Sequence, residues 1–150
     1  MDYVDDYLFD GVYVLIGEDG SVVDDEGYPI IQYVWGHFWV NNHAHVLTGK
    51  SPMTNEHLFM LLCQIEVLPY VTGAVQPKLS QTNLKSIPIV AASDEVCRAF
   101  SGVIQPFFTS IRILTNQSRA LAAQRDALLP GLVSGEVGVG YANELMEASP

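Results

Sequence analysis

The stretch TGAVQPKLSQTNLKSIPI, residues 72–89, decides how this chain is interpreted. It contains a glycine and a Gln-Pro-Lys triplet, continues with small polar residues and ends in Ile-Pro-Ile. Glycine, proline and short polar side chains favour turns over helices, so we expect a polar loop. Because Pro88 cannot donate a backbone hydrogen bond, we expect residues 86–90 to form an edge strand. A long helical pattern follows directly.

Upstream of this stretch, short apolar runs separated by turn residues predict a series of strands. The expected strands are 12–16, 21–23, 30–34, 37–40 and 44–47, with Gly36 as a break between the third and fourth. Leu58, Leu61, Leu62 and Ile65 then recur at helical spacing. They predict a helix over 55–67, with Thr54 as its N-cap and Pro69 beyond its end.

Downstream, the pattern predicts one long helix from Ser93, a natural N-cap, to about Leu129, where Leu-Pro-Gly stops it. Pro106 predicts a kink or short break. The apolar residues recur mostly every three or four positions, which is the spacing of a coiled-coil seam and indicates a partner helix. The helix-pairing residues expected in this seam are Val96, Phe100, Val103, Phe107, Ile111, Leu114, Leu121 and Leu128.

These elements predict an α+β fold, in which a small mixed β-sheet domain is followed by a long protruding helix that pairs in a coiled coil. The predicted divisions are a β-rich domain over 1–91, the helix over 92–131 and a glycine-rich, flexible tail over 132–150.

Composition limits the class of protein. The chain has 150 residues, 49% of them hydrophobic, which suffices for a packed core. No uninterrupted apolar run approaches the length of a membrane span, and the acidic start is unlike a signal peptide, so we expect a cytoplasmic protein. The net charge is −10. Such acidity argues against DNA binding by this chain without partners, because phosphate neutralisation supplies most of that affinity.

Three histidines, His37, His43 and His45, raise the alternative of a metal-dependent nuclease. Metal sites require three or four convergent ligands, and the sequence offers no Cys or Glu at the usual partner spacing. No nucleophile elbow or phosphate loop is present either. We therefore predict no catalytic residue and no metal site.

The polar loop offers a different chemistry. Glutamine and asparagine suit the reading of adenine, and lysine suits guanine or phosphate. By composition alone, a solvated connection before an edge strand is the favoured explanation of the loop. The candidate DNA-facing residues of this stretch are Thr72, Gln76, Lys78, Ser80, Gln81 and Asn83.

Four segments in order carry a family resemblance. They are GVYVLIGEDGSV (11–22), WVNNHAHVL (39–47), the stretch 72–89, and QRDALLPGLVSGEV (124–137) after the long helix. Together they resemble the specificity subunit of type I restriction-modification enzymes over residues 7–137. The resemblance implies that 1–91 is part of a target recognition domain and that 92–131 is the spacer helix.

The resemblance also implies a function. In that family each of two recognition domains reads one half of a split DNA sequence, and two helices pack antiparallel as a spacer. The subunit performs no chemistry and docks methyltransferase subunits, which use S-adenosylmethionine. Restriction subunits, which use ATP and magnesium, join through them. No cofactor is expected in this chain. The resemblance adds Asn41, Asn42, His43 and His45 to the candidate DNA-facing residues.

The chain departs from the family pattern in having one recognition domain, one helix and few residues before the matching region. We therefore expect a C-terminal fragment of a specificity subunit or a truncated reading frame. Two copies joined through their helices are the expected homodimer. The alternative is an interaction module that dimerises or docks on a methyltransferase without reading DNA.

Overall fold

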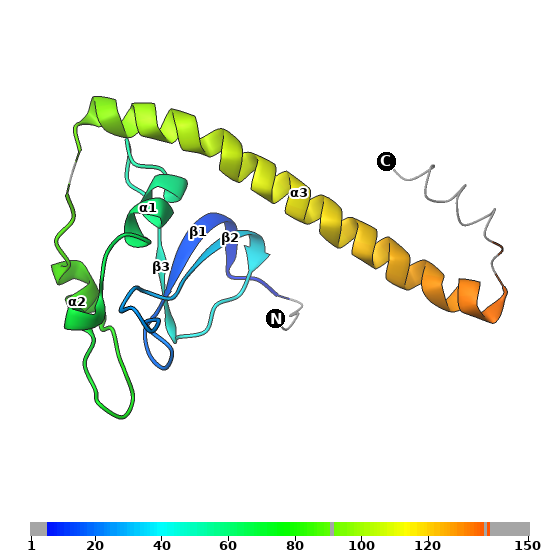
Figure 1. The fold of residues 1–150 in the computed structure, drawn as a ribbon, viewed down its shortest axis with the longest axis horizontal. Helices are drawn as coiled ribbons and strands as arrows, with labels where there is room; N and C mark the ends of the chain where they lie inside the picture. The colour runs from blue at the N-terminus through cyan, green and yellow to red at the C-terminus, as the bar shows by residue number, and fades with distance from the viewer. Residues whose placement is uncertain (1–5, 91, 137, 139–150) are drawn as a thin grey trace. The chain divides into compact units, whose positions relative to one another are not determined.

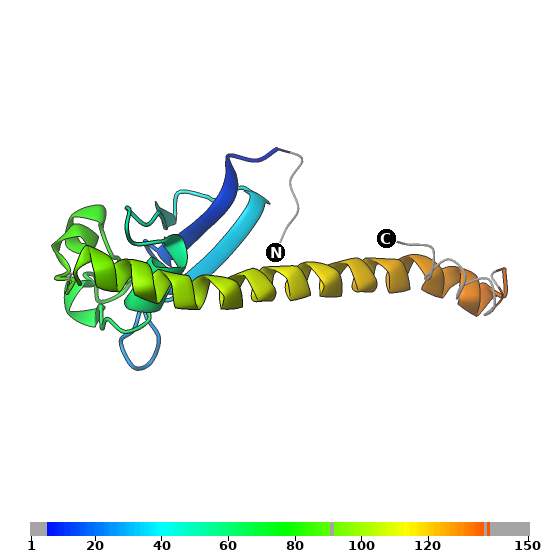
Figure 2. The same cartoon turned by 90° about the horizontal axis from the view of Figure 1, so that it is seen from above.

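The computed structural model describes residues 6–90, 92–136 and 138. Strands β1 (Phe9–Gly17), β2 (Ile31–Phe38) and β3 (Ala44–Leu47) form one sheet in the order β2-β1-β3. The views in Figure 1 and Figure 2 show β1 and β2 as a long pair lying side by side. Both strand pairings are antiparallel, so this sheet is not mixed as predicted, whereas the α+β class is confirmed.

The position of the central strand β1 accounts for its continuous apolar sequence. Val14 and Ile16 are fully buried and Leu15 nearly so, because β1 has a neighbour on each side and cover on both faces. A strand buried on both faces reads as a continuous apolar run rather than an alternating one. Gly36 does not divide two strands as predicted. It lies within β2 with a φ of 81°, a left-handed conformation that favours glycine.

The predicted strand at 21–23 is reduced to one isolated bridge between Val23 and Pro29. This short connection returns the chain from β1 toward β2. Val22 is nonetheless buried and joins the hydrophobic core. Val22 thus packs inside the protein although the predicted strand around it does not form.

Helix α1 (Asn55–Leu62) begins where predicted, since the Thr54 hydroxyl accepts a hydrogen bond from the His57 amide at 3.3 Å. It ends five residues earlier than predicted, and a short 3-10 turn, η1 (Leu68–Tyr70), follows. The amides of Val67 and Leu68 bond the carbonyl of Gly27 instead of continuing the helix. A tertiary contact that the local pattern does not encode therefore shortens α1.

Helix α2 (Gln81–Ser86) corrects the prediction of a loop followed by a strand. The Ser80 hydroxyl accepts from the Asn83 amide at 3.2 Å, and the Leu84 amide bonds the Ser80 carbonyl at 2.8 Å. A serine N-cap stabilises the first turn of a helix, and Gln81, Leu84 and Lys85 are themselves good helix formers. Residues 87–90, expected to extend an edge strand, pair with no strand among the described residues.

The predicted long helix is present as α3 (Asp94–Ser134). It begins at the predicted cap, where the Val96 amide lies 3.4 Å from the Ser93 hydroxyl. The break expected at Pro106 is wrong, because the helix continues through it. Proline removes one hydrogen bond, to residue 102, and that residue is a glycine with open space around it.

The stop expected at 129–131 is also wrong, since α3 continues to Ser134. Gly135 ends the helix instead, with a φ of 77° and an amide that bonds the Leu132 carbonyl. A left-handed glycine just past the last turn is a common helix terminator.

Contacts within the chain group Met1–Phe107 as one unit and Phe108–Pro150 as another. This division lies inside α3. Of the predicted tail, residues 132–134 belong to α3, and residues 137 and 139–150 lie outside the described residues. Among the described residues, no helix has the length and apolar character needed to cross a membrane.

Candidate nucleic-acid interface

The polar stretch is anchored by one apolar residue. Leu79 is fully buried and forms the core cluster with Ile16 and Val22. Partly buried residues, among them Tyr70 and Leu84, pack around this cluster. Leu79 thus fixes the chain between two polar segments, the loop 72–78, which we name the finger, and helix α2.

Backbone hydrogen bonds close the finger at its base. Thr72 and Lys78 form an antiparallel bridge, with N–O distances of 2.9 and 2.7 Å. The finger is also tied to the turn after β1. The Leu79 amide bonds the Glu18 carbonyl at 2.7 Å, and the Gly20 amide bonds the Pro77 carbonyl at 3.2 Å. The finger is therefore held by its main chain as well as by its anchor.

Gly73 is required within the finger. Its φ of 92° lies in the left-handed region, and a Cβ atom built there would overlap the carbonyl oxygen of Gln76. Any other residue would combine backbone strain with a collision against main-chain atoms. The glycine of the sequence motif thus sets the shape of the finger.

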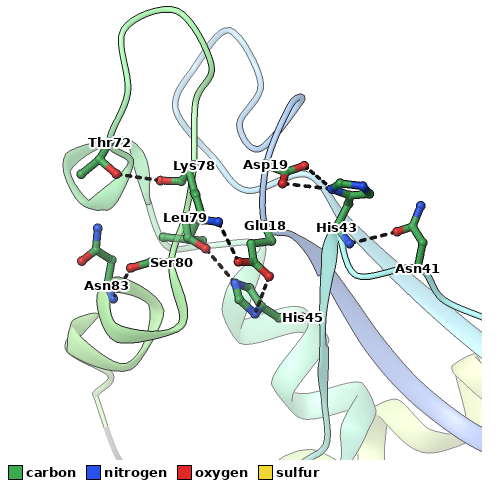
Figure 3. A network of polar contacts seen from close by, with 10 residues as sticks. All are labelled: Glu18, Asp19, Asn41, His43, His45, Thr72, Lys78, Leu79, Ser80 and Asn83. Atoms are coloured by element: carbon green, nitrogen blue, oxygen red, sulfur yellow. Dashed lines mark hydrogen bonds and ion pairs between the residues drawn. The ribbon is translucent and has the colours of Figure 1, made fainter.

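A carboxylate joins the finger to β3. Glu18 lies 3.1 Å from the Lys78 ammonium and 4.0 Å from Nδ1 of His45 (Figure 3). The other ring nitrogen of His45, Nε2, donates a hydrogen bond to the Leu79 carbonyl at 2.7 Å. Because a carbonyl oxygen only accepts, Nε2 carries a proton in this arrangement. His45 therefore supports the anchor of the finger.

A second carboxylate joins the turn before β3 to the same place. Nδ1 of His43 lies 2.8 and 3.0 Å from the two carboxylate oxygens of Asp19. The His43 amide donates to the Asn41 side chain at 3.1 Å, which shapes the turn (Figure 3). The His43 carbonyl also accepts from the Glu18 backbone amide. The segments 41–45 and 72–83 thus meet on either side of residues 18–20.

Most of the predicted DNA-facing side chains hold this edge together. Beyond the contacts above, the Thr72 hydroxyl donates to the Lys78 carbonyl at 3.3 Å, and the side-chain Nδ2 of Asn83 donates to the Tyr70 carbonyl at 2.8 Å. Three candidates remain exposed without a side-chain hydrogen bond to any described residue, namely Asn42, Gln76 and Gln81.

Sequence reasoning missed Glu18 and Asp19, the carboxylates at the centre of this edge. Their partners lie at least 24 residues away in the chain, so no local spacing reveals the contacts. The only signal was a turn, GEDG, that directly follows a buried strand. Such turns bring their side chains to one edge of a sheet.

The three histidines do not converge. His37 stacks on Tyr7, with ring centroids 3.9 Å apart, and lies 3.5 Å from Asp10. His43 and His45 bond to different partners, as described above. Within residues 6–90, 92–136 and 138, no three His, Cys, Asp or Glu side chains form a group able to hold a metal ion.

Helix α3 carries two apolar faces in its first turns. Cys97, Ser101 and Ile104 are buried, with at most 9% of each side chain accessible. Of the predicted pairing residues in these turns, Val103 and Phe107 are exposed, at 63% and 66%. Phe100 is 38% exposed and packs edge-on against His57 of α1, with ring centroids 4.7 Å apart. Further along, Ile111, Leu114 and Leu121 are also exposed, and Leu128 is half-buried.

Comparison with known proteins identifies the family. Residues 1–117 match the family model of the type I restriction modification DNA specificity domain. The chain belongs to this family. The match to the type I specificity domain covers β1, β2, β3, the finger, α1, α2 and more than half of α3. The resemblance found in the sequence is therefore confirmed.

Two curated relatives of the specificity family agree. A Haemophilus influenzae protein named as a type I restriction enzyme specificity subunit is 42% identical over 88 residues, 59% of this chain and 22% of the relative. The MjaIX specificity subunit of Methanocaldococcus jannaschii is 30% identical over 139 residues, 88% of this chain and 31% of the relative. The chain thus spans about a fifth to a third of these relatives. No solved structure matches it.

Proposed function

We propose that this chain recognises DNA sequence in a type I restriction-modification complex, where it reads one half of a split target and performs no chemistry. The supporting observation is the family match over residues 1–117, which includes the whole edge built from 18–20, 41–45 and 72–83. That edge presents exposed amides on a backbone held by internal contacts, which suits recognition of base edges.

The charge of this edge supports the need for a partner subunit in DNA binding. Lys78, the best phosphate ligand of the finger, is paired with Glu18, and the whole chain carries a net charge of −10. Such a surface attracts the DNA backbone poorly. We therefore propose that methyltransferase subunits supply most of the phosphate contacts, while this chain supplies selectivity. S-adenosylmethionine stays with those subunits, ATP and magnesium stay with the restriction subunit, and the complex works in the cytoplasm.

The test is co-purification of this chain with its methyltransferase subunit, followed by footprinting on random-sequence duplex DNA. The proposal predicts a complex that protects a split, symmetric sequence and binds more weakly as salt rises. Protection of a symmetric site would also support two copies joined through α3. Protection that is equal on all sequences would contradict recognition and leave only docking.

A second candidate function, an interaction module, is favoured by the exposed apolar residues of α3. Leu114 and Leu121 are more than 60% exposed, which is unusual for leucines repeated along one helix. If they pair with another helix, Leu121→Asp should reduce oligomer size in light scattering. Ala123→Asp, on the opposite side of the same turn, is the matched control and should leave size unchanged. An interaction module would show this loss together with no DNA sequence preference.

A further inference from the structure

We infer that the tip of the finger reads an A·T base pair in the major groove, with Val75 against the thymine methyl group and the Gln76 amide on adenine. This inference rests on the proposed function and assigns it a chemical target. Val75 enters no sequence-based list of candidates, because an apolar residue in a polar loop carries no signal of its own.

The exposure of Val75 is the first observation. Its side chain is 99% exposed, the largest value among the exposed large apolar residues of the described chain. A single exposed apolar residue is common on protein surfaces and needs no explanation. Val75 is different because it precedes Gln76, an exposed amide without a side-chain partner among the described residues, on a loop of fixed shape.

The fixed backbone is the second observation. The Thr72–Lys78 bridge closes the loop, the bonds to Glu18 and Gly20 tie it to the sheet, and Gly73 sets its turn. Binding through a loop that is already ordered avoids much of the entropy cost of fixing a flexible one. The internal contacts of this edge therefore serve to present its tip.

The dimensions of the finger fit the groove. Three residue steps separate Thr72 from Val75, which allows a reach of at most about 10 Å. The major groove of B-DNA is about 8.5 Å deep and about 12 Å wide, and it admits a two-stranded ribbon. The finger is narrower still at its base, where one antiparallel bridge joins Thr72 to Lys78, so its tip can meet base edges while its base stays near the phosphates.

The two side chains select one base pair. In the major groove adenine presents a donor, N6, beside an acceptor, N7, and a glutamine amide complements both. Guanine presents two acceptors there, so a glutamine satisfies only half of its own groups. Thymine alone among the four bases carries a methyl group, which suits an apolar neighbour. Adjacent glutamine and valine side chains therefore favour A·T over the other pairs.

The electrostatics at the base of the finger permit DNA to approach its tip. Glu18 and Asp19 lie near the finger, and free carboxylates there would repel phosphates. Each faces cationic or protonatable groups instead, Lys78 and His45 around Glu18 and His43 beside Asp19. The local field is thus weaker than the net charge of the chain implies.

The experiment uses the full chain in complex with its methyltransferase subunit and the target found by footprinting. Each thymine of the site is replaced in turn by uracil, which removes only the methyl group. At one position this should weaken wild-type binding about 4-fold, the equivalent of one buried methyl group. The Val75→Ala complex should lose this sensitivity. Val90→Ala, also highly exposed but outside the finger, is the matched control and should keep it.

A second arm tests Gln76. Replacement of the paired adenine by 7-deazaadenine should weaken DNA binding by the wild-type complex about 5-fold or more. The same replacement should not change DNA binding by the Gln76→Ala complex. The inference would be overturned if the wild type and both finger variants responded equally to these base replacements at every A·T pair. The proposed function would still stand if the wild-type complex bound its target sequence specifically. Absence of any sequence preference in the wild-type complex would overturn the proposed function, and the inference with it.

Discussion

The edge around the finger and the exposed face of α3 are both candidate contact surfaces, but they are built in opposite ways. At the edge, Lys78, His43, His45 and Asn83 are engaged by neighbours in the same chain. On α3, large apolar residues such as Val103 and Phe107 remain exposed. The edge is therefore organised by contacts within the chain, whereas these residues of α3 stay exposed in the described part of the chain.

The largest expected effect separates the two faces of α3. Ile104→Asp places a carboxylate in a side-chain site that is 9% exposed and should lower the free energy of unfolding by about 3 kcal/mol or more. Its neighbour Val103 is 63% exposed, so Val103→Asp should cost about 0.5 kcal/mol. Urea denaturation of both variants measures the difference. Similar losses in the two would show that the exposed face is already packed within the chain.

The next effect concerns the anchor of the finger. Leu79→Ala should lower the free energy of unfolding by about 2–5 kcal/mol, because a fully buried leucine leaves a cavity in the core. Val75→Ala, at the exposed tip, is the control and should change stability by less than about 0.5 kcal/mol. Thermal melts followed by circular dichroism report both values. A small effect of Leu79→Ala would mean that the finger is not held by the core.

A smaller effect tests the shape of the finger. Gly73→Ala should destabilise by about 1–3 kcal/mol, since it adds a backbone collision to a left-handed φ. Gly20→Ala also has a positive φ, of 76°, but meets open space and should cost only about 1 kcal/mol. The difference between these variants in denaturant unfolding isolates the collision with Gln76. Equal costs would show that the finger relaxes around the added methyl group.

The smallest effect concerns the histidine that supports the anchor. His45→Leu removes the donor to the Leu79 carbonyl and should cost about 1–2 kcal/mol. The exposed His37 provides the comparison, and His37→Leu should stay within about 0.5 kcal/mol. Chemical denaturation at a single pH compares the two. An equal loss in the free energy of unfolding for His37→Leu and His45→Leu would show that His45 has no special role in stabilising the edge.

Local signals in the sequence predicted several features correctly. Thr54 and Ser93 act as N-caps because a capping hydroxyl needs only the next few amides. The strand run in β1 was recognisable because burial on both faces leaves an uninterrupted apolar string. The family resemblance rested on four ordered segments and was confirmed over 1–117.

The errors arose where distant residues decide the local structure. Helix α1 ends early because Gly27 accepts the amides of Val67 and Leu68, and nothing near residue 62 indicates this. Helix α2 was missed because it is short and flanked by Pro77 and Pro88, so the turn-favouring residues around it outweighed the Ser80 cap. Glu18 and Asp19 were missed because their partners lie far along the chain. The candidate DNA-facing residues remain predictions, although the structure brings their two segments to one edge.

We propose that this chain directs a methyltransferase to a DNA sequence. The most direct measurement is single-molecule sequencing of modified bases in cells that express the methyltransferase subunit with or without this chain. We predict methylation at one split motif. This methylation should appear only when the chain is present and should decline in the Val75→Ala, Gln76→Ala double variant. An identical methylation pattern with and without the chain would contradict it.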